Sequence, residues 1–120
     1  MSDKKEKNGK KAKDADKQSG QKKNKLKRVE VIFSAALDED FVEGFKKNKI
    51  GSHFTKISGV TGAGFSNPKL GDAVWPQLNE MLIVYCPKDE AEKIIELAEQ
   101  LREKYPMEGV ACFVSKASVR

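Results

Sequence analysis

A glycine-rich stretch flanked by lysines is the part of this 120-residue chain whose residue types and spacing could bind an anion. Gly59, Gly62 and Gly64 have no Cβ, so their backbone N–H groups could approach a phosphate or carboxylate, and Lys56 and Lys69 are the nearby cations. P-loops and dinucleotide-binding loops also need a helix directly after the glycines, whereas this chain continues as proline-containing loop. Two interpretations stay open: the glycines only shape a turn, or the loop contacts a ligand or partner at a subunit boundary.

Two aromatic residues of the same loop, Phe65 and Trp75, are candidates for contact with a partner protein. Trp75 is the only tryptophan of the chain. A tryptophan here either anchors the loop to the body of the domain through its large apolar area or recognises a partner, since tryptophan is enriched at binding hot spots. Both interpretations stay open.

The remaining residues do not form a recognisable catalytic or metal-binding pattern. His53 is the only histidine, and one histidine with scattered carboxylates makes neither a metal site nor a catalytic triad. Cys86 and Cys112 lie in apolar segments, where a thiol behaves as a small buried hydrophobe and lacks the base or positive field that activates it. We therefore predict a protein without enzymatic activity, catalytic residues or a metal site.

The charge of the chain is divided between two regions. The net charge is +5, but residues 1–28 hold twelve Lys/Arg against four Asp/Glu, whereas residues 29–120 sum to −3. Residues 1–27 contain too few apolar side chains to offset a backbone ordering cost of about 1–2 kcal/mol per residue, so we predict a disordered Lys-rich tail. The tail either keeps the protein in solution or attracts nucleic acid or anionic membrane weakly through its charge.

The N-terminal tail and the cysteines also indicate the cellular compartment of the protein. No apolar stretch follows its positive charges, as a secretory signal would require, and two cysteines without a signal suit a reducing compartment. We expect a cytoplasmic protein.

Periodicity over residues 28–116 predicts one domain with two strand–helix–strand units. Apolar alternation predicts a strand at 29–33, and acidic residues begin a helix that Gly51 ends. A weaker strand is expected at 53–58, followed by the 59–76 loop and an apolar strand at 81–86. Asp89 and Glu92 have the spacing of a capping pair for the second helix, and the last strand follows at 110–114, before a short tail at 117–120. The order βαββαβ predicts an α+β, ferredoxin-like fold: a four-stranded antiparallel sheet with two helices on one face.

Two of the predicted strands, 81–86 and 110–114, are apolar on both faces. A sheet with helices on one face normally has polar residues on the other. The apolar residues on both faces of these strands therefore indicate that a second layer of protein packs on the face without helices. The chain has no third layer to supply it, and a second copy of the subunit is the expected cover. With the strands numbered along the chain, the order expected for this fold is 4-1-3-2, so the first strand lies between the third and the fourth. Cys86 of the third strand and Cys112 of the fourth should then be too far apart for a disulfide, and we predict no intrachain disulfide.

Over about residues 28–116 the chain resembles the PII-type signalling proteins, in particular their small PII-like relatives. The resemblance rests on the βαββαβ order and on residues 54–76, FTKISGVTGAGFSNPKLGDAVWP, followed by NEMLIVYCPKDEAEKIIELAEQL. It implies a nitrogen regulatory type of signal transduction, a trimer with its sheets inward, and a 59–76 loop that is a compact form of the regulatory T-loop.

Two features depart from the pattern of that family. The loop has no tyrosine, the residue that is uridylylated in some PII proteins. The turn before the last strand has Glu108 and Gly109 where nucleotide-binding members have a glycine-rich, basic loop, and only Lys116 and Arg120 follow. An adenine nucleotide stays a candidate ligand, but the usual basic residues are not evident and the cofactor stays unknown.

The resemblance implies a regulatory homotrimer, and with the glycine- and lysine-containing loop it leads us to expect that the protein senses a small anionic ligand between its subunits. The predicted ligand-binding residues are Lys56, Gly59, Gly62, Gly64 and Lys69 of one subunit with Glu108 and Gly109 of its neighbour. Glycine N–H groups would donate and the lysines would neutralise charge, while Phe65 and Trp75 would contact a partner. The resemblance implies a transporter or metabolic enzyme as that partner. The alternative is a nucleic-acid-associated protein that acts through the Lys-rich tail.

Overall fold

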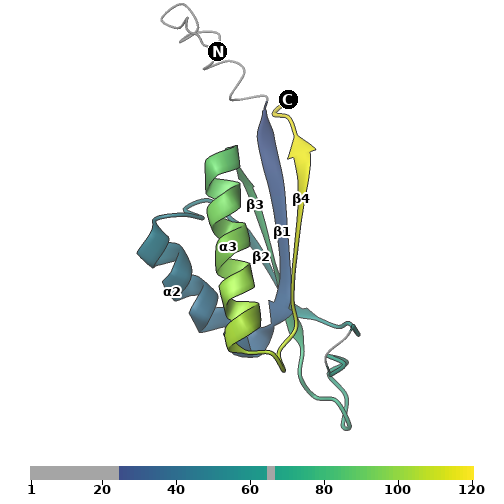
Figure 1. The fold of residues 1–120 in the computed structure, drawn as a ribbon. Helices are drawn as coiled ribbons and strands as arrows, with labels where there is room; N and C mark the ends of the chain where they lie inside the picture. The colour runs from purple at the N-terminus through teal and green to yellow at the C-terminus, as the bar shows by residue number, and fades with distance from the viewer. Residues whose placement is uncertain (1–24, 65–66) are drawn as a thin grey trace, which may run out of the picture.

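The computed structural model describes residues 25–64 and 67–120. Its elements are β1 (Leu26–Ser34), the 3-10 turn η1 (Ala35–Leu37), α2 (Asp38–Asn48), β2 (Thr55–Val60), β3 (Asn79–Cys86), α3 (Lys88–Lys104) and β4 (Val110–Ala117) (Figure 1). The predicted βαββαβ order is confirmed, with η1 as an addition. Most of the predicted Lys-rich tail, up to residue 24, and the candidate partner-binding residue Phe65 lie outside the described residues.

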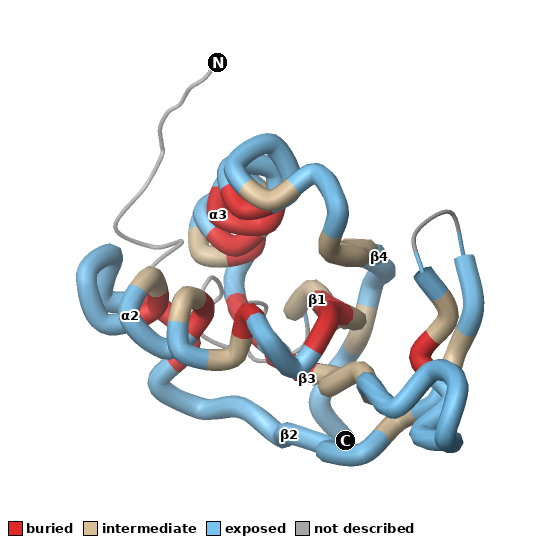
Figure 2. Tube along the Cα trace, turned by 90° about the horizontal axis from the view of Figure 1, so that it is seen from below, coloured by how far each residue is buried: buried red, intermediate tan, exposed pale blue. Residues whose placement is uncertain are grey.

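The four strands form one antiparallel sheet in the order β2-β3-β1-β4, which confirms the predicted strand order. Both helices lie on the same face of this sheet (Figures 1 and 2). The central strand β1 places Lys27 opposite Cys86 of β3 and Val31 opposite Cys112 of β4. The two cysteines therefore sit on strands that β1 separates, and both are free.

The strands β1 and β4 extend further than their apolar alternation predicted. Strand β1 begins at Leu26 and β4 ends at Ala117, and these two residues pair with each other. A ladder of backbone hydrogen bonds does not depend on apolar side chains, so pairing continues past the last apolar positions. The sheet therefore includes Leu26 and Lys27, which the sequence placed in the N-terminal tail, and Ala117, which it placed in the C-terminal one.

The helix α2 ends before the glycine that was predicted to stop it. Its last residue is Asn48, and Lys49 closes it in the left-handed conformation (φ 55°, ψ 46°), with its N–H directed to the carbonyls of Lys46 and Phe45. Gly51 follows at φ +64°, where an added Cβ would overlap the ring of Phe45. The chain therefore uses two left-handed residues to turn from the helix toward β2.

The helix α3 begins without the predicted capping pair. Pro87 is its N-cap residue and makes no side-chain cap, and the helix already begins at Lys88, so the prediction for Asp89 and Glu92 is wrong. The fixed φ of proline suits a helix start, and the N-cap lies two residues earlier than the predicted Asp89. Asp89 lies in the first turn, where its negative charge still faces the positive end of the helix dipole.

The hydrophobic core lies between the helices and one face of the sheet. Val29 and Val31 of β1 are fully buried, and Phe33 of the same strand packs on Phe41 of α2 with ring centroids 4.3 Å apart. Ile94 of α3, also fully buried, completes the layer. Burial of each such side chain contributes about 1.5–3 kcal/mol to folding, so this face holds the helices on the sheet.

The opposite face of the sheet, which we call the open face, has no layer over it in the described chain (Figure 2). Paired residues of neighbouring strands point to the same side, so the register places Ile57, Ile83, Tyr85 and Phe113 on this face. Tyr85 and Phe113 are 53% and 58% exposed. The apolar side chains of β3 thus lie alternately on the two faces of the sheet, and the helices cover only one of these faces.

Candidate functional site

The loop between β2 and β3 folds into a small hairpin beyond one end of the sheet (Figure 1). The N–H of Gly62 donates to the carbonyl of Lys69 (2.8 Å), and the N–H of Lys69 donates back to Gly62 (2.7 Å). Further along, Oδ1 of Asp72 accepts from the N–H groups of Val74 (3.1 Å) and Trp75 (2.6 Å), which closes a second turn. The loop therefore has defined local structure although its sequence has no period.

The three candidate glycines occupy different environments. Gly59 has φ +72° and lies where the register of β2 shifts between Ile57 and Val60, so the left-handed conformation there favours glycine. Among the atoms of residues 25–64 and 67–120, none lies within 4 Å of a Cβ added at Gly59 or Gly64, which leaves room beside both backbones in this part of the chain. The N–H of Gly62, by contrast, is already bonded within the hairpin.

The first candidate cation, Lys56 of β2, is held by two carboxylates of its own chain. Its Nζ lies 2.5 Å from Oδ1 of Asp38, the first residue of α2, and 3.1 Å from Oε1 of Glu80 on β3. The hydrogen bond to Asp38 is the main cause that raises the pKa of Lys56 above its usual 10.5. Among the described residues no well-directed hydrogen bond reaches the buried Oε1 of Glu80, so its contact with Lys56 is electrostatic. An external anion would have to compete with both carboxylates.

The second candidate cation, Lys69, is buried inside the loop hairpin. It is only 3% exposed, and its Nζ donates to the carbonyl of Asn67 at 3.0 Å. Lysine is rarely buried to this extent without a partner for its ammonium group. The side chain of Lys69 therefore points into the loop, where it holds the hairpin together in this conformation.

The turn before β4 lies at the same end of the sheet as the loop. The N–H of Ser34, the last residue of β1, donates to the carbonyl of Gly109, and the N–H of Ala35 donates to Leu78 at the base of the loop, each at 3.0 Å. The N–H of Glu108 donates to Tyr105 within the turn (3.0 Å). One chain thus brings Gly109 and the loop base to the end of β1; their contribution across a subunit boundary stays a prediction.

The loop also presents apolar side chains to solvent. Trp75 is 37% exposed, so it neither packs fully on the domain nor stands free. Its neighbour Val74 is 75% exposed and Leu70 is 42% exposed. Sequence reasoning selected Trp75 and missed Val74 and Leu70, because aliphatic residues between Gly and Pro carry no distinctive signal.

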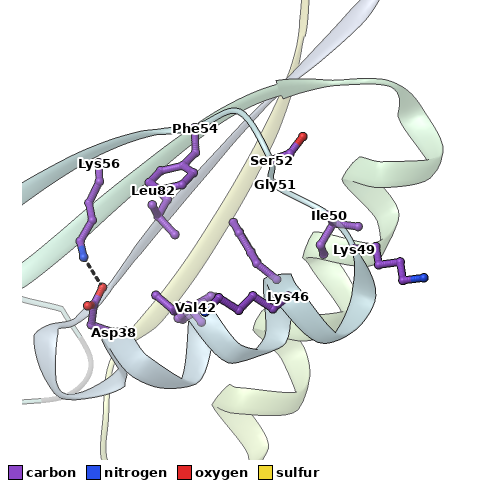
Figure 3. A pocket seen from close by; sticks show the side chains of 12 residues that line it. Asp38, Val42, Lys46, Lys49, Ile50, Gly51, Ser52, Phe54, Lys56 and Leu82 are labelled. Carbon is purple, nitrogen blue, oxygen red and sulfur yellow. Dashed lines mark ion pairs between the residues drawn. The ribbon is translucent and has the colours of Figure 1, made fainter.

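A groove between α2 and β2 was also missed by sequence reasoning. It has a volume of about 460 Å³ and lies on the helix-covered side of the sheet. Its walls are apolar, with Phe54 and Leu82 facing Val42 across it, and the Asp38–Lys56 ion pair lies at one end (Figure 3). No linear motif marks this groove, since its walls come from three segments that are distant in sequence.

The two cysteines lie on the helix-covered face and are poor nucleophiles. Burial, with the nearby carboxylates of Glu90 and Asp89, raises the pKa of the Cys86 thiol to about 11. Burial also raises the pKa of Cys112 above its ordinary value. Both thiols are therefore protonated at neutral pH, in line with their interpretation as apolar packing residues.

The described residues contain neither a membrane-spanning helix nor a cluster of metal ligands. Across residues 25–64 and 67–120, no helix combines the length and the apolar character needed to cross a bilayer. In the same residues, no three side chains of His, Cys, Asp or Glu gather where they could hold a metal ion.

The fold and the loop define a class: a ferredoxin-like sheet that carries a folded β2–β3 loop and the turn before β4 at one end. The chain is similar to the solved structure of CPII, a nitrogen regulatory PII-like protein from Thiomonas intermedia K12 bound to ADP, AMP and bicarbonate. The two share 18% sequence identity with a TM-score of 0.65, over 79% of this chain and 88% of CPII. A protein described as PII-like and signalling, from Thermus thermophilus, shares 21% identity with a TM-score of 0.54, over 80% and 90% of the two chains.

No protein-family model and no curated protein sequence matches this chain. The apo form of CPII is also similar in structure, with 17% identity and a TM-score of 0.52 over 80% of this chain and 95% of CPII. The chain therefore has the fold of the nitrogen regulatory PII-like proteins, and the resemblance drawn from its sequence is confirmed for the fold.

Proposed function

We propose that this chain is a cytoplasmic PII-like regulatory protein without catalytic activity. It would assemble as a homotrimer, bind a small anionic ligand between its subunits and engage a protein partner through the 59–76 loop. The observation that carries this proposal is the structural likeness to CPII, which binds ADP, AMP and bicarbonate in its solved structures. A second support is the open face, since Tyr85 and Phe113 would bury their exposed area against another subunit.

The proposed ligand site uses the loop-bearing end of the sheet. The described residues leave space beside Gly59 and Gly64, which would let a ligand approach their backbones, with Gly62 between them. Glu108 and Gly109 of the neighbouring subunit would complete the site.

The positions of the lysines support a link between binding and loop conformation. The ammonium groups of Lys56 and Lys69 already contact oxygen atoms of the same chain. An anion that recruits either lysine must displace Asp38, Glu80 or the Asn67 carbonyl from it. Recruitment of Lys69 would open the hairpin of the loop, which would alter the surface that carries Trp75 for a transporter or metabolic enzyme.

A thermal-shift titration of the full chain tests the proposal, with ADP, AMP, ATP, bicarbonate, a cyclic dinucleotide and Mg²⁺ as probes. A ligand at a hundred times its Kd stabilises the folded state by about 2.7 kcal/mol, which is a shift of several degrees in a domain of this size. We expect ADP or AMP, with bicarbonate, to raise the melting temperature.

Paired variants locate the response. Gly64→Val fills the free space beside the loop backbone and should abolish the ligand-dependent shift while it leaves the unliganded melting temperature unchanged. Ser118→Val adds bulk at the exposed C-terminal end, away from the loop, and should keep the shift (Figure 1). A melting temperature that none of the probes moves would contradict the sensor function.

The alternative function, nucleic-acid association through the Lys-rich tail, is favoured by one observation: the net charge of +8 over residues 1–28. Deletion of residues 1–24 removes most of this charge and retains Leu26, which pairs with Ala117. The regulatory proposal expects unchanged assembly and ligand shifts after this deletion. The alternative expects loss of an RNA affinity that also falls steeply with salt.

A further inference from the structure

We infer that the groove between α2 and β2 is a binding site for an organic anion with an apolar body, such as a medium-chain carboxylate. This inference does not depend on the proposed regulatory function. The groove belongs to one chain and lies on the side of the sheet opposite the open face. It shares Lys56 with the residues predicted to bind the regulatory ligand, but it includes neither the loop glycines nor the 105–109 turn.

The size and walls of the groove fit the apolar body. Its volume of about 460 Å³ falls within the range of small-molecule sites, about 300–1,000 Å³. Val42 and Phe54 are 44% and 54% exposed and line opposite sides, over a floor that includes the buried Leu82. A ligand between them would cover apolar surface that the described chain leaves in water, which favours binding.

The charged side chains around the groove favour a ligand with a negative charge. Three lysines line it, Lys46, Lys49 and Lys56, against one acid, Asp38. Lys56 is neutralised by Asp38 and Glu80 at one end. Within the described residues, Lys46 and Lys49 have no carboxylate within ion-pair distance. The carboxylate of Glu90 accepts from the N–H of Gly51 at this end (2.8 Å), so two lysines stand against one acid and the balance stays positive. An anionic head group would meet that charge while its body lies along the apolar walls.

The backbone at this cationic end is also unusual. Lys49 adopts the left-handed conformation, in which glycine or asparagine is normally found and which is unfavourable for a lysine. In Figure 3 its ammonium group points away from the groove, so contact with a bound anion would require rotation about its side-chain torsions. Lysines at the end of a helix also compensate the helix dipole, so a control within α2 is needed.

Lys47 supplies that control, because it shares the helix end but does not line the groove. The experiment is an NMR titration of the full ¹⁵N-labelled chain with octanoate at low salt, with 1-octanol as a neutral probe of equal length. Octanoate is expected to shift the amide signals of residues 41–54 and of Leu82, and to bind more tightly than octanol. Lys46→Gln and Lys49→Gln should each weaken octanoate about two- to fivefold, the range for an exposed charge pair, whereas Lys47→Gln should leave it unchanged.

A second variant tests the walls. Val42→Asp places a carboxylate on a partly exposed wall, where the fold tolerates it, and should abolish the octanoate-dependent shifts while the remaining spectrum keeps its dispersion. Equal affinity for octanol, equal weakening by Lys47→Gln, or shifts centred on Ile57, Tyr85 and Phe113 of the open face would each overturn the inference.

Discussion

On the helix-covered face of the sheet Val29 and Val31 are fully buried, whereas on the open face Tyr85 and Phe113 keep more than half of their surface exposed. Both faces are built from the same strands. Along β3, Leu82, Val84 and Cys86 point to the helices, and the residues between them point to the open side. Alternation therefore divides apolar side chains between two faces, and the position of the helices decides which face becomes the core of a single chain. The other face is available for a second copy.

The largest expected effect is on the covered face. Phe33→Ala removes a ring that is 1% exposed and packs on Phe41, and should lower the free energy of unfolding by about 3–5 kcal/mol. Urea denaturation measures this change. Phe54→Ala is the matched control, since it deletes the same ring at a position that is 54% exposed, and its cost should be much smaller. Equal costs would remove the distinction between core and surface.

The open face is tested by adjacent residues of β4 that point to opposite faces. Phe113→Asp should abolish the proposed trimer and leave a species of 13.4 kDa with an unchanged circular dichroism spectrum, because a carboxylate would be buried at the interface. Val114→Asp places the same charge on the helix-covered side, where Val114 is 42% exposed, and should keep the assembly. Light scattering gives both masses. A wild-type mass of one chain would contradict the assembly.

The ion pairs of the two faces should also differ in strength. Lys56→Met leaves the buried Oε1 of Glu80 without its cation and should cost about 1–3 kcal/mol, with recovery when Glu80→Gln is added. Arg28→Met removes the Arg28–Glu30 pair of the open face (2.6 Å), which is more exposed and should cost about 0–1 kcal/mol. Denaturation of the three variants measures these costs. An unchanged stability for Lys56→Met would favour a role for Lys56 in ligand binding alone.

The smallest effect concerns the buried thiol of Cys86. Its pKa is raised in the folded chain from an ordinary 9.0 to about 11, so the folded state favours the protonated thiol. The resulting stabilisation is complete below pH 9 and is lost as the pH rises through about 11. At pH 10 the wild type should lose on the order of 1 kcal/mol more, relative to pH 8, than Cys86→Ala. Identical pH profiles for the two proteins would show that the thiol is not buried as described.

Much of the fold was predictable because its signals are local. Alternation along β1, the apolar run of β3 and the helical spacing in α3 gave the elements and their order. Contacts between distant residues were not predictable. The sequence predicts Lys56 as a cation available to a ligand, but its partners Asp38 and Glu80 are 18 and 24 residues away in the sequence. The charge of Lys69 also predicts an available cation, and its burial becomes visible only in the folded hairpin between Gly62 and Lys69.

The sequence by itself determined the class of fold and the presence of apolar residues on both faces of the sheet, since the period of a strand distributes side chains without reference to the rest of the chain. The tertiary structure decided which face the helices cover, which carboxylates hold Lys56, and that α2, β2 and β3 leave a groove between them. These features depend on the relative placement of elements, and that placement follows from the packing of the whole domain.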